Sequence, residues 1–213
     1  MGAGSIPSVK TRATPAAGTY DVPVRLADEA ACTEAEGPGK RYALWFQGCS
    51  LRCPGCANPG MLDPAGGYGA TVGDVAARLR AARDRHGLRG VTLLGGEPFD
   101  QPEALRGIVA AARGLGLDVL LFTGHTLEAL RARRDPVTDA VLAGTDALVD
   151  GPYLAERHTD RLYLRGSDNQ RVHVLGPGLG PGDLTGPNRL EVRVRDGEVE
   201  ITGFPGVLGP YAD

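Results

Sequence analysis

The chain has 213 residues, which fits one domain and is long enough to bury a sizeable core. Its formal net charge is −3, so it lacks the broad basic surface that binding to nucleic acid requires. The sequence has no run of about 18 apolar residues and no apolar signal-peptide segment at its start. We therefore expect a soluble, cytoplasmic protein with no membrane partner.

The first part of the chain changes from polar to apolar and then to a loop. Residues 1–18 are small and polar, and we expect them to be disordered. Residues 22–26 alternate weakly and predict a first strand, and residues 42–46 form an apolar run that predicts a second. Residues 49–70 hold three cysteines and several Gly and Pro residues, so we predict a loop there.

Helical and strand patterns then alternate. Thr71 is a predicted N-cap for a helix that runs to Gly87, and Thr126 is a predicted start for another. Asp100 and Glu103 have the spacing of a capping box, which predicts a helix that begins at Asp100. A further helical turn or two is expected over 137–143. The later strands are predicted at 91–94, 118–122, 147–149 and 171–175.

Glycine and polar residues follow three of these strands at once. They are Gly95-Gly96-Glu97, Thr123-Gly124 and Asp150-Gly151. Continuously apolar strands that are separated by helices are typical of a parallel sheet covered on its faces. Ligands of such sheets bind at the carboxyl ends of the strands. The sequence therefore predicts a binding site where these residues lie.

The C-terminal part follows a different pattern. Residues 176–188 are rich in Gly and Pro and are expected to be a linker. Apolar and polar residues then alternate on both sides of Asp196-Gly197, which predicts an antiparallel hairpin within 189–213.

Three of the four cysteines, Cys49, Cys53 and Cys56, fall within eight residues. Three thiolates on one short loop can hold a metal centre and leave one coordination position for another ligand. Two alternatives use Cys32 as a fourth ligand, either of a structural zinc or of an electron-transfer cluster. In the reading with three ligands, Cys32 is a small residue of the core.

The spacing C-x3-C-x2-C resembles the signature of the radical S-adenosylmethionine (radical SAM) superfamily. The residues around it, 37–59, resemble the branch that activates glycyl radical enzymes, and within that branch the activators of anaerobic ribonucleotide reductases. The chain departs from the pattern of related proteins at three positions. Gly55 replaces a common aromatic residue, Ala57 replaces a common His, and Pro152 replaces a Lys. Further matching segments are Gly95-Gly96-Glu97-Pro98, Leu121–Gly124, Asp146–Tyr153 and Arg165–Arg171.

This resemblance implies a fold, two cofactors and a reaction. Residues 19–175 would form a partial (β/α) barrel of the radical SAM type, followed by the C-terminal hairpin. A [4Fe–4S] cluster would be held by Cys49, Cys53 and Cys56, and S-adenosylmethionine (SAM) would bind its remaining iron. One electron would cleave SAM to a 5′-deoxyadenosyl radical, which abstracts a hydrogen atom from the target.

The resemblance also implies contacts to SAM. Gly95, Gly96 and Glu97, followed by Pro98, would receive its ammonium group, and Gly55 to Ala57 would line its adenine. Thr123, Gly124 and Asp150 would hold its ribose or methionine part, and Arg171 would pair with its carboxylate. The implied partners are a glycyl radical enzyme as protein substrate and a flavodoxin- or ferredoxin-type electron donor.

Two other functions stay open from the sequence. The same chemistry could modify a peptide or a small metabolite, because the hairpin has no counterpart in the resembling family. In a different class, the cysteines could belong to a zinc or iron–sulfur binding module without catalysis.

Overall fold

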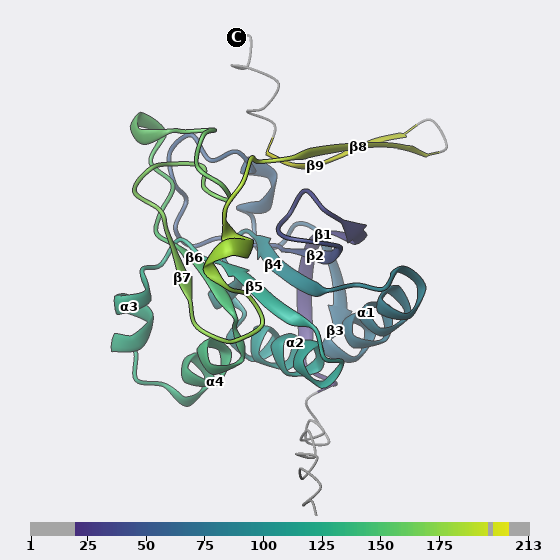
Figure 1. Ribbon diagram of the computed structural model, residues 1–213. Coiled ribbons are helices and arrows are strands. Elements are labelled where there is room, and N and C mark those ends of the chain that lie inside the picture. The colour runs from purple at the N-terminus through teal and green to yellow at the C-terminus, as the bar shows by residue number, and fades with distance from the viewer. Residues whose placement is uncertain (1–19, 196–197, 205–213) are drawn as a thin grey trace, which may run out of the picture.

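The computed structural model describes residues 20–195 and 198–204. It shows a mixed α/β fold with one seven-stranded sheet and a separate two-stranded hairpin (Figure 1). The strand order in the large sheet is β3-β1-β2-β4-β5-β6-β7. Its strands are β1 (Pro23–Thr33), β2 (Arg41–Phe46), β3 (Tyr68–Thr71), β4 (Gly90–Gly95), β5 (Asp118–Phe122), β6 (Ala147–Asp150) and β7 (Arg171–Val174).

The centre of the sheet is parallel, as the sequence predicts. Strands β2, β4, β5 and β6 run in one direction, so their carboxyl ends lie at one edge. Strand β1 is antiparallel to β2, and β3 is antiparallel to β1. The last strand, β7, is antiparallel to β6. It departs from the parallel pattern because a 3₁₀ turn, Ala155–Arg157, is the helical element between the two strands.

The helices begin close to where the sequence places them, with one exception. They are α1 (Val72–His86), α2 (Pro102–Gly114), α3 (Leu127–Ala132) and α4 (Pro136–Gly144). Thr71 caps α1 through a capping box with Asp74, and Gly87 ends it in the left-handed conformation. The predicted cap at Asp100 is wrong, since α2 begins at Pro102 with Gln101 as its N-cap. The predicted loop over 49–70 is wrong at its end, where Tyr68–Thr71 form β3.

The four helices pack against one face of the sheet. Val119 and Leu121 of β5 belong to the core that these helices share with the strands. Leu120, between them, faces the opposite side, where it packs with Leu164, Leu179 and other apolar residues. Residues 176–188, expected as a linker, therefore cover the face of the sheet that the helices leave free.

Polar contacts hold this covering segment at the starts of the strands. The Gly178 N–H donates to Asp146 Oδ1 at 2.8 Å, and Arg89 pairs with Asp183 at 2.7 Å. Asp146 precedes β6 and Arg89 precedes β4, so the segment is anchored at the edge opposite the carboxyl ends.

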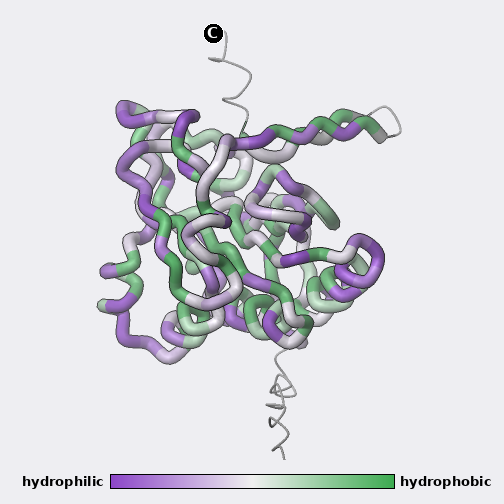
Figure 2. Tube along the Cα trace, in the orientation of Figure 1, coloured by the Kyte–Doolittle hydropathy of each residue, from purple (hydrophilic) through white to green (hydrophobic). Residues whose placement is uncertain are grey.

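The predicted C-terminal hairpin is present as β8 (Leu190–Arg195) and β9 (Glu198–Gly203). It projects from the body of the protein, and hydrophobic and hydrophilic residues alternate along it (Figure 2). Its base contacts the β1–β2 connection, where the Gly203 N–H donates to the buried carboxylate of Glu36 at 2.6 Å. Its apolar face is exposed and consists of Val192, Val194, Val199 and Ile201.

Among the described residues, no helix is long and apolar enough to cross a membrane.

Candidate functional site

The residues singled out in the sequence lie at the carboxyl edge of the parallel strands. The cysteines follow β2, the Gly95-Gly96-Glu97 segment ends β4, and Thr123-Gly124 follows β5. Asp150 is the last residue of β6, and Arg171 pairs with it in register at the start of β7. Strands far apart in the sequence thus bring the predicted site together on one edge.

The cysteine loop, residues 49–57, begins where β2 ends. Its entrance is fixed by backbone bonds, since the Gly48 N–H donates to Met61 O at 2.9 Å and the Cys49 N–H to Leu62 O at 3.3 Å. Gly48 has a φ of 90° and Gly55 a φ of 72°, which side chains with a Cβ rarely adopt. The loop therefore turns sharply at both glycines.

All three cysteines of this loop are free thiols and are half-buried. Burial raises the pKa of the Cys49 thiol, while N–H groups of Arg52 and Leu51 act in the opposite direction. The Cys56 Sγ accepts the N–H of Asn58 at 3.4 Å. N–H groups that point at sulfur are a common feature of iron–sulfur sites, so the donor set fits such a cluster.

Cys32 lies at the other end of the same pair of strands. It is the penultimate residue of β1, whose last residue, Thr33, pairs with Arg41 at the start of β2. Cys49 lies beyond Phe46, the last residue of β2, so the length of that strand separates the two cysteines. Cys32 packs against the main core, as predicted for a residue that is not a ligand.

This placement removes both alternatives that need Cys32 as a fourth ligand. Within residues 20–195 and 198–204, no three His, Cys, Asp or Glu side chains gather closely enough to hold a single metal ion. A four-iron cluster does not require such a gathering, because each thiolate binds a different iron atom.

Gly95 and Gly96 allow the end of β4 to lie directly against the end of β2. A Cβ on Gly96 would lie 2.1 Å from the carbonyl oxygen of Gly48, and a Cβ on Gly95 would lie 2.4 Å from the nitrogen of Phe46. The Glu97 N–H donates to that same Gly48 oxygen at 2.9 Å. The double glycine is therefore required for close backbone approach beside the cysteine loop.

Glu97 connects the ends of β4 and β5. Its buried carboxylate accepts the hydroxyl of Thr123 at 2.9 Å and the N–H of Gly124 at 2.9 Å. It also accepts the N–H of Phe99 at 2.9 Å, at the start of the 3₁₀ turn Pro98–Asp100. Burial raises the pKa of Glu97 to about 7, although these hydrogen bonds act to lower it. A carboxylate with so many protein partners fixes the shape of this edge.

The raised pKa of Glu97 predicts a pH-dependent stability of the cluster-free protein. The folded state binds the proton more tightly than the unfolded state, so this stabilisation is full below about pH 4.5 and is lost as the pH rises through about 7. Compared with Glu97→Gln, wild type should lose up to about 3 kcal/mol of unfolding free energy across that interval. Urea unfolding of both proteins between pH 4 and 8 measures the difference.

Glu36, whose pKa burial also raises to about 7, is present in both proteins and cancels in this comparison. A difference between the two unfolding free energies that does not change with pH would contradict the assignment to Glu97.

Asp150 and Arg171 form an ion pair at the end of β6. The Arg171 Nη2 lies 2.5 Å from Asp150 Oδ2 and 2.6 Å from an oxygen of Glu128. Although burial opposes ionisation, Arg171 and the N–H of Leu127 hold the pKa of Asp150 below its usual range. In this structure both side chains hold the edge of the sheet together. Their predicted contacts with SAM stay predictions.

The remaining predicted residues lie around the cysteine loop. A Cβ on Gly124 would lie 2.4 Å from Leu51 Cδ1, which places the loop directly over the end of β5. A Cβ on Gly55 would lie 3.1 Å from the Ala155 methyl group, so the connection after β6 lies against the far side of the loop. Ala57 is exposed, and Pro98 is buried.

Two side chains that were not among the predicted site residues also bind this edge. Asp100 bonds to Ser50 in the cysteine loop. The Gln101 amide donates to the carbonyl oxygens of Arg25 and Gln47 at 2.8 and 2.9 Å. Two polar residues so soon after Gly95–Pro98 could have indicated a place in the site. The capping-box spacing instead led to the interpretation of Asp100 as a helix N-cap.

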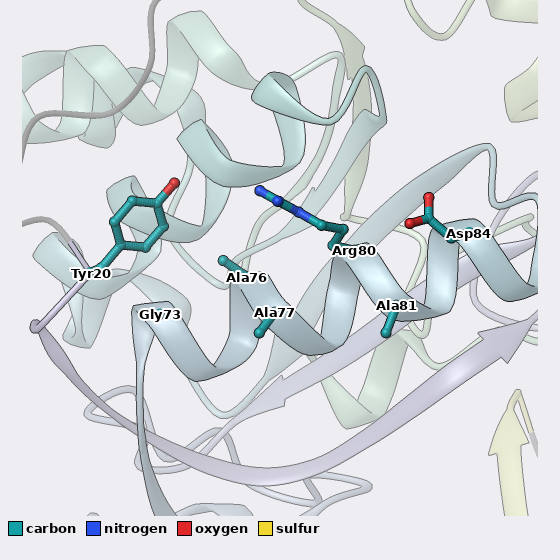
Figure 3. Close-up of a pocket in the computed structure, with 7 residues that line it drawn as sticks. All are labelled: Tyr20, Gly73, Ala76, Ala77, Arg80, Ala81 and Asp84. Carbon is teal, nitrogen blue, oxygen red and sulfur yellow. The ribbon is translucent and has the colours of Figure 1, made fainter.

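A pocket of about 500 Å³ lies elsewhere, along the surface of α1 (Figure 3). Tyr20 stands beside the start of the helix, and Arg80 extends over it. None of its described lining residues is a predicted site residue, and most are small. They are Tyr20, Gly73, Ala76, Ala77, Arg80, Ala81 and Asp84.

Comparison with known proteins agrees with this geometry. Residues 35–173 match the sequence family described as "4Fe-4S single cluster domain", a range that contains all of the predicted site residues. The anaerobic ribonucleoside-triphosphate reductase-activating protein of Salmonella typhimurium is 32% identical over 147 residues, which cover 65% of this chain and 91% of that protein. The protein of the same name from Enterobacteria phage T4 is 31% identical over 145 residues, which cover 66% and 88%.

A second kind of activating enzyme is also similar. The pyruvate formate-lyase 1-activating enzyme of Escherichia coli K12 is 34% identical over 122 residues, which cover 55% of this chain and 47% of that enzyme. The resemblance read from the cysteine spacing and the Gly95–Pro98 segment is thereby confirmed. The chain belongs to the 4Fe–4S single-cluster family and, within it, to the radical SAM activating enzymes.

Proposed function

We propose that this chain is a radical SAM enzyme that generates a glycyl radical on a partner enzyme of the anaerobic ribonucleotide reductase type. One observation supports this proposal most strongly. Three free cysteines and the double glycine at the end of β4 lie at the same edge of the sheet. Two relatives that match about two thirds of this chain are named as activating proteins of such a reductase. The named substrate of those relatives supports the partner proposed here.

In this proposal Cys49, Cys53 and Cys56 bind three irons of a [4Fe–4S] cluster, and the fourth iron is left for SAM. When bound, the reduced cluster would supply the one electron that breaks the sulfonium C–S bond of SAM, giving methionine and a 5′-deoxyadenosyl radical that would take a hydrogen atom from a glycine of the partner and leave as 5′-deoxyadenosine. The chain itself contributes placement. Gly95 at the end of β4 and Gly96 after it let the ends of β2 and β4 lie in contact beside the cysteine loop, and Glu97 links them to the end of β5.

The predicted contacts to SAM are part of the proposal. Carbonyl groups of Gly95 and Gly96, with Glu97, receive the ammonium group, and backbone groups of Gly55 and Ala57 line the adenine. These groups fit because the glycines leave backbone atoms uncovered by side chains. The other proposed contacts to the ribose, the methionine part and the carboxylate are Thr123, Gly124, Asp150 and Arg171.

We also propose that the seven-stranded sheet is a partial barrel of the radical SAM type. Its helices pack on one face alone, as they do in a (β/α) barrel, and the edge strands β3 and β7 do not pair with each other. An open barrel leaves the radical site accessible to a large protein, which would close it. A flavodoxin- or ferredoxin-type donor and a cytoplasmic location complete the proposal.

The reaction is tested with reconstituted protein under anaerobic conditions. Wild type that is incubated with SAM and dithionite should release 5′-deoxyadenosine, and Cys53→Ala should release none. Addition of an anaerobic ribonucleotide reductase from the same organism should give the doublet of a glycyl radical in electron paramagnetic resonance (EPR). Absence of 5′-deoxyadenosine from protein that holds a full cluster would contradict the reaction.

One observation favours a second target class. The exposed hairpin lies outside residues 35–173, so the match to the family does not account for it. If 5′-deoxyadenosine forms but the reductase gains no radical, a peptide or a small metabolite becomes the favoured substrate.

A further inference from the structure

Beyond Cys49, the cysteine loop is hydrogen-bonded to another element through one pair of residues, Ser50 and Asp100. The Ser50 N–H donates to Asp100 Oδ2 at 2.6 Å, and the Ser50 hydroxyl donates to Asp100 Oδ1 at 2.8 Å. Within the part of the chain that the structure describes, no other hydrogen bond links residues 50–57 to a different element. The stretch that carries Cys53 and Cys56 therefore depends on this pair for its polar attachment.

Asp100 is itself held firmly. It ends the 3₁₀ turn Pro98–Asp100, and its N–H donates to Glu97 O at 3.0 Å. The next residue, Gln101, bonds through its side chain to the backbone of β1 and to Gln47 after β2. Asp100 thus projects from a segment that is fixed on both sides, which is what a positioning residue requires.

We propose that Asp100 is a positioning residue that fixes the cysteine loop on the end of β4 and places a negative charge beside the cluster. The inference rests on the proposed role of Cys49, Cys53 and Cys56 as cluster ligands. It goes beyond that role, because Asp100 is not a ligand and acts through Ser50. Mutation of a group that holds a metal ligand in place commonly lowers metal affinity by about 10- to 100-fold.

The charge has a second, separable consequence. The carboxylate of Asp100 lies 2.6 Å from the backbone nitrogen of Ser50, the residue directly after Cys49, so its charge is held beside the first cysteine of the loop. A negative charge beside a cluster opposes the addition of an electron, so it makes the reduction potential more negative. Loss of the charge should therefore move the potential in the less negative direction.

Ser50 and Asp100 are both exposed, so the hydrogen bonds between them contribute little to the free energy of unfolding, about 1 kcal/mol. Variants at Asp100 should fold normally, and the melting temperature of the cluster-free protein checks this. Asp139→Ala is the matched control, because Asp139 is an exposed aspartate on α4.

The test compares Asp100→Ala, Asp100→Asn and Asp139→Ala after reconstitution. Asp100→Ala removes both the bonds and the charge, and retention of iron and sulfide against a chelator should fall about tenfold. Asp100→Asn keeps an acceptor for the Ser50 N–H but removes the charge. It should retain its cluster, and EPR-monitored redox titration should give a less negative potential than wild type.

The inference would be overturned if Asp100→Ala retains iron and sulfide as well as wild type does and the reduction potential of Asp100→Asn is unchanged. That result would leave the proposed function intact. Failure of wild type itself to take up a cluster would instead overturn the proposed function.

Discussion

Replacement of any one of Cys49, Cys53 or Cys56 by Ala should abolish cluster binding, whereas Cys32→Ala should leave it unchanged. With three ligands and no fourth cysteine within reach, the loss of one thiolate leaves two, which is too few to hold a [4Fe–4S] cluster. Cys32 lies at the opposite end of β1 and β2 and packs in the core. Iron and sulfide content and absorbance at about 400 nm after anaerobic reconstitution measure the outcome.

Cys32→Ala serves as the matched control for this series, because it makes the same chemical change at a cysteine outside the loop. Its substitution costs only the packing of a half-buried side chain. A colourless Cys32→Ala variant would show that Cys32 is a ligand and would contradict the three-ligand site. A brown Cys53→Ala variant with full iron content would contradict it equally.

The second large effect is expected at Gly96. A methyl group there would lie 2.1 Å from Gly48 O and 3.0 Å from Met61 O, and both are backbone atoms that cannot rotate away. Gly96→Ala must therefore force the ends of β2 and β4 apart, at a cost of about 3 kcal/mol in unfolding free energy. The same shift moves the entrance of the cysteine loop, so cluster uptake and SAM binding should both fall sharply. Urea unfolding, iron content and calorimetric titration with SAM report the three effects.

Gly60→Ala is the control for Gly96→Ala. Gly60 lies in the nearby 3₁₀ turn Pro59–Met61, and a Cβ on it would meet no atom within 4 Å. Its stability should be equal to that of wild type or slightly greater, because Ala restricts the unfolded chain. If Gly96→Ala is as stable as Gly60→Ala and takes up as much cluster, the close approach of β2 and β4 is not required.

The sequence was sufficient to predict the edge on which the site lies. Apolar strands that end at Gly95, Thr123 and Asp150 predict parallel neighbours, and parallel neighbours share a carboxyl edge. The cysteine loop joins this edge because it follows a strand of the same direction. The prediction therefore needed only the local apolar patterns and the rule that parallel strands share a carboxyl edge.

Other features depend on contacts between distant segments, which local patterns do not contain. Asp100 has the spacing of a helix cap, but Ser50, fifty residues earlier in the chain, competes for its carboxylate. Residues 176–188 have the composition of a linker, but Leu179 and Leu184 find an uncovered sheet face. The exclusion of Cys32 from the site likewise became visible only once the register of β1 and β2 was known.

The central claim is that three thiolates at the end of β2 hold a cluster with one iron free for SAM. EPR of the dithionite-reduced, reconstituted protein, recorded with and without SAM, tests it most directly. The account predicts the signal of a reduced [4Fe–4S] cluster whose line shape changes when SAM is added, because SAM binds the iron that no cysteine occupies. Identical spectra with and without saturating SAM would contradict it.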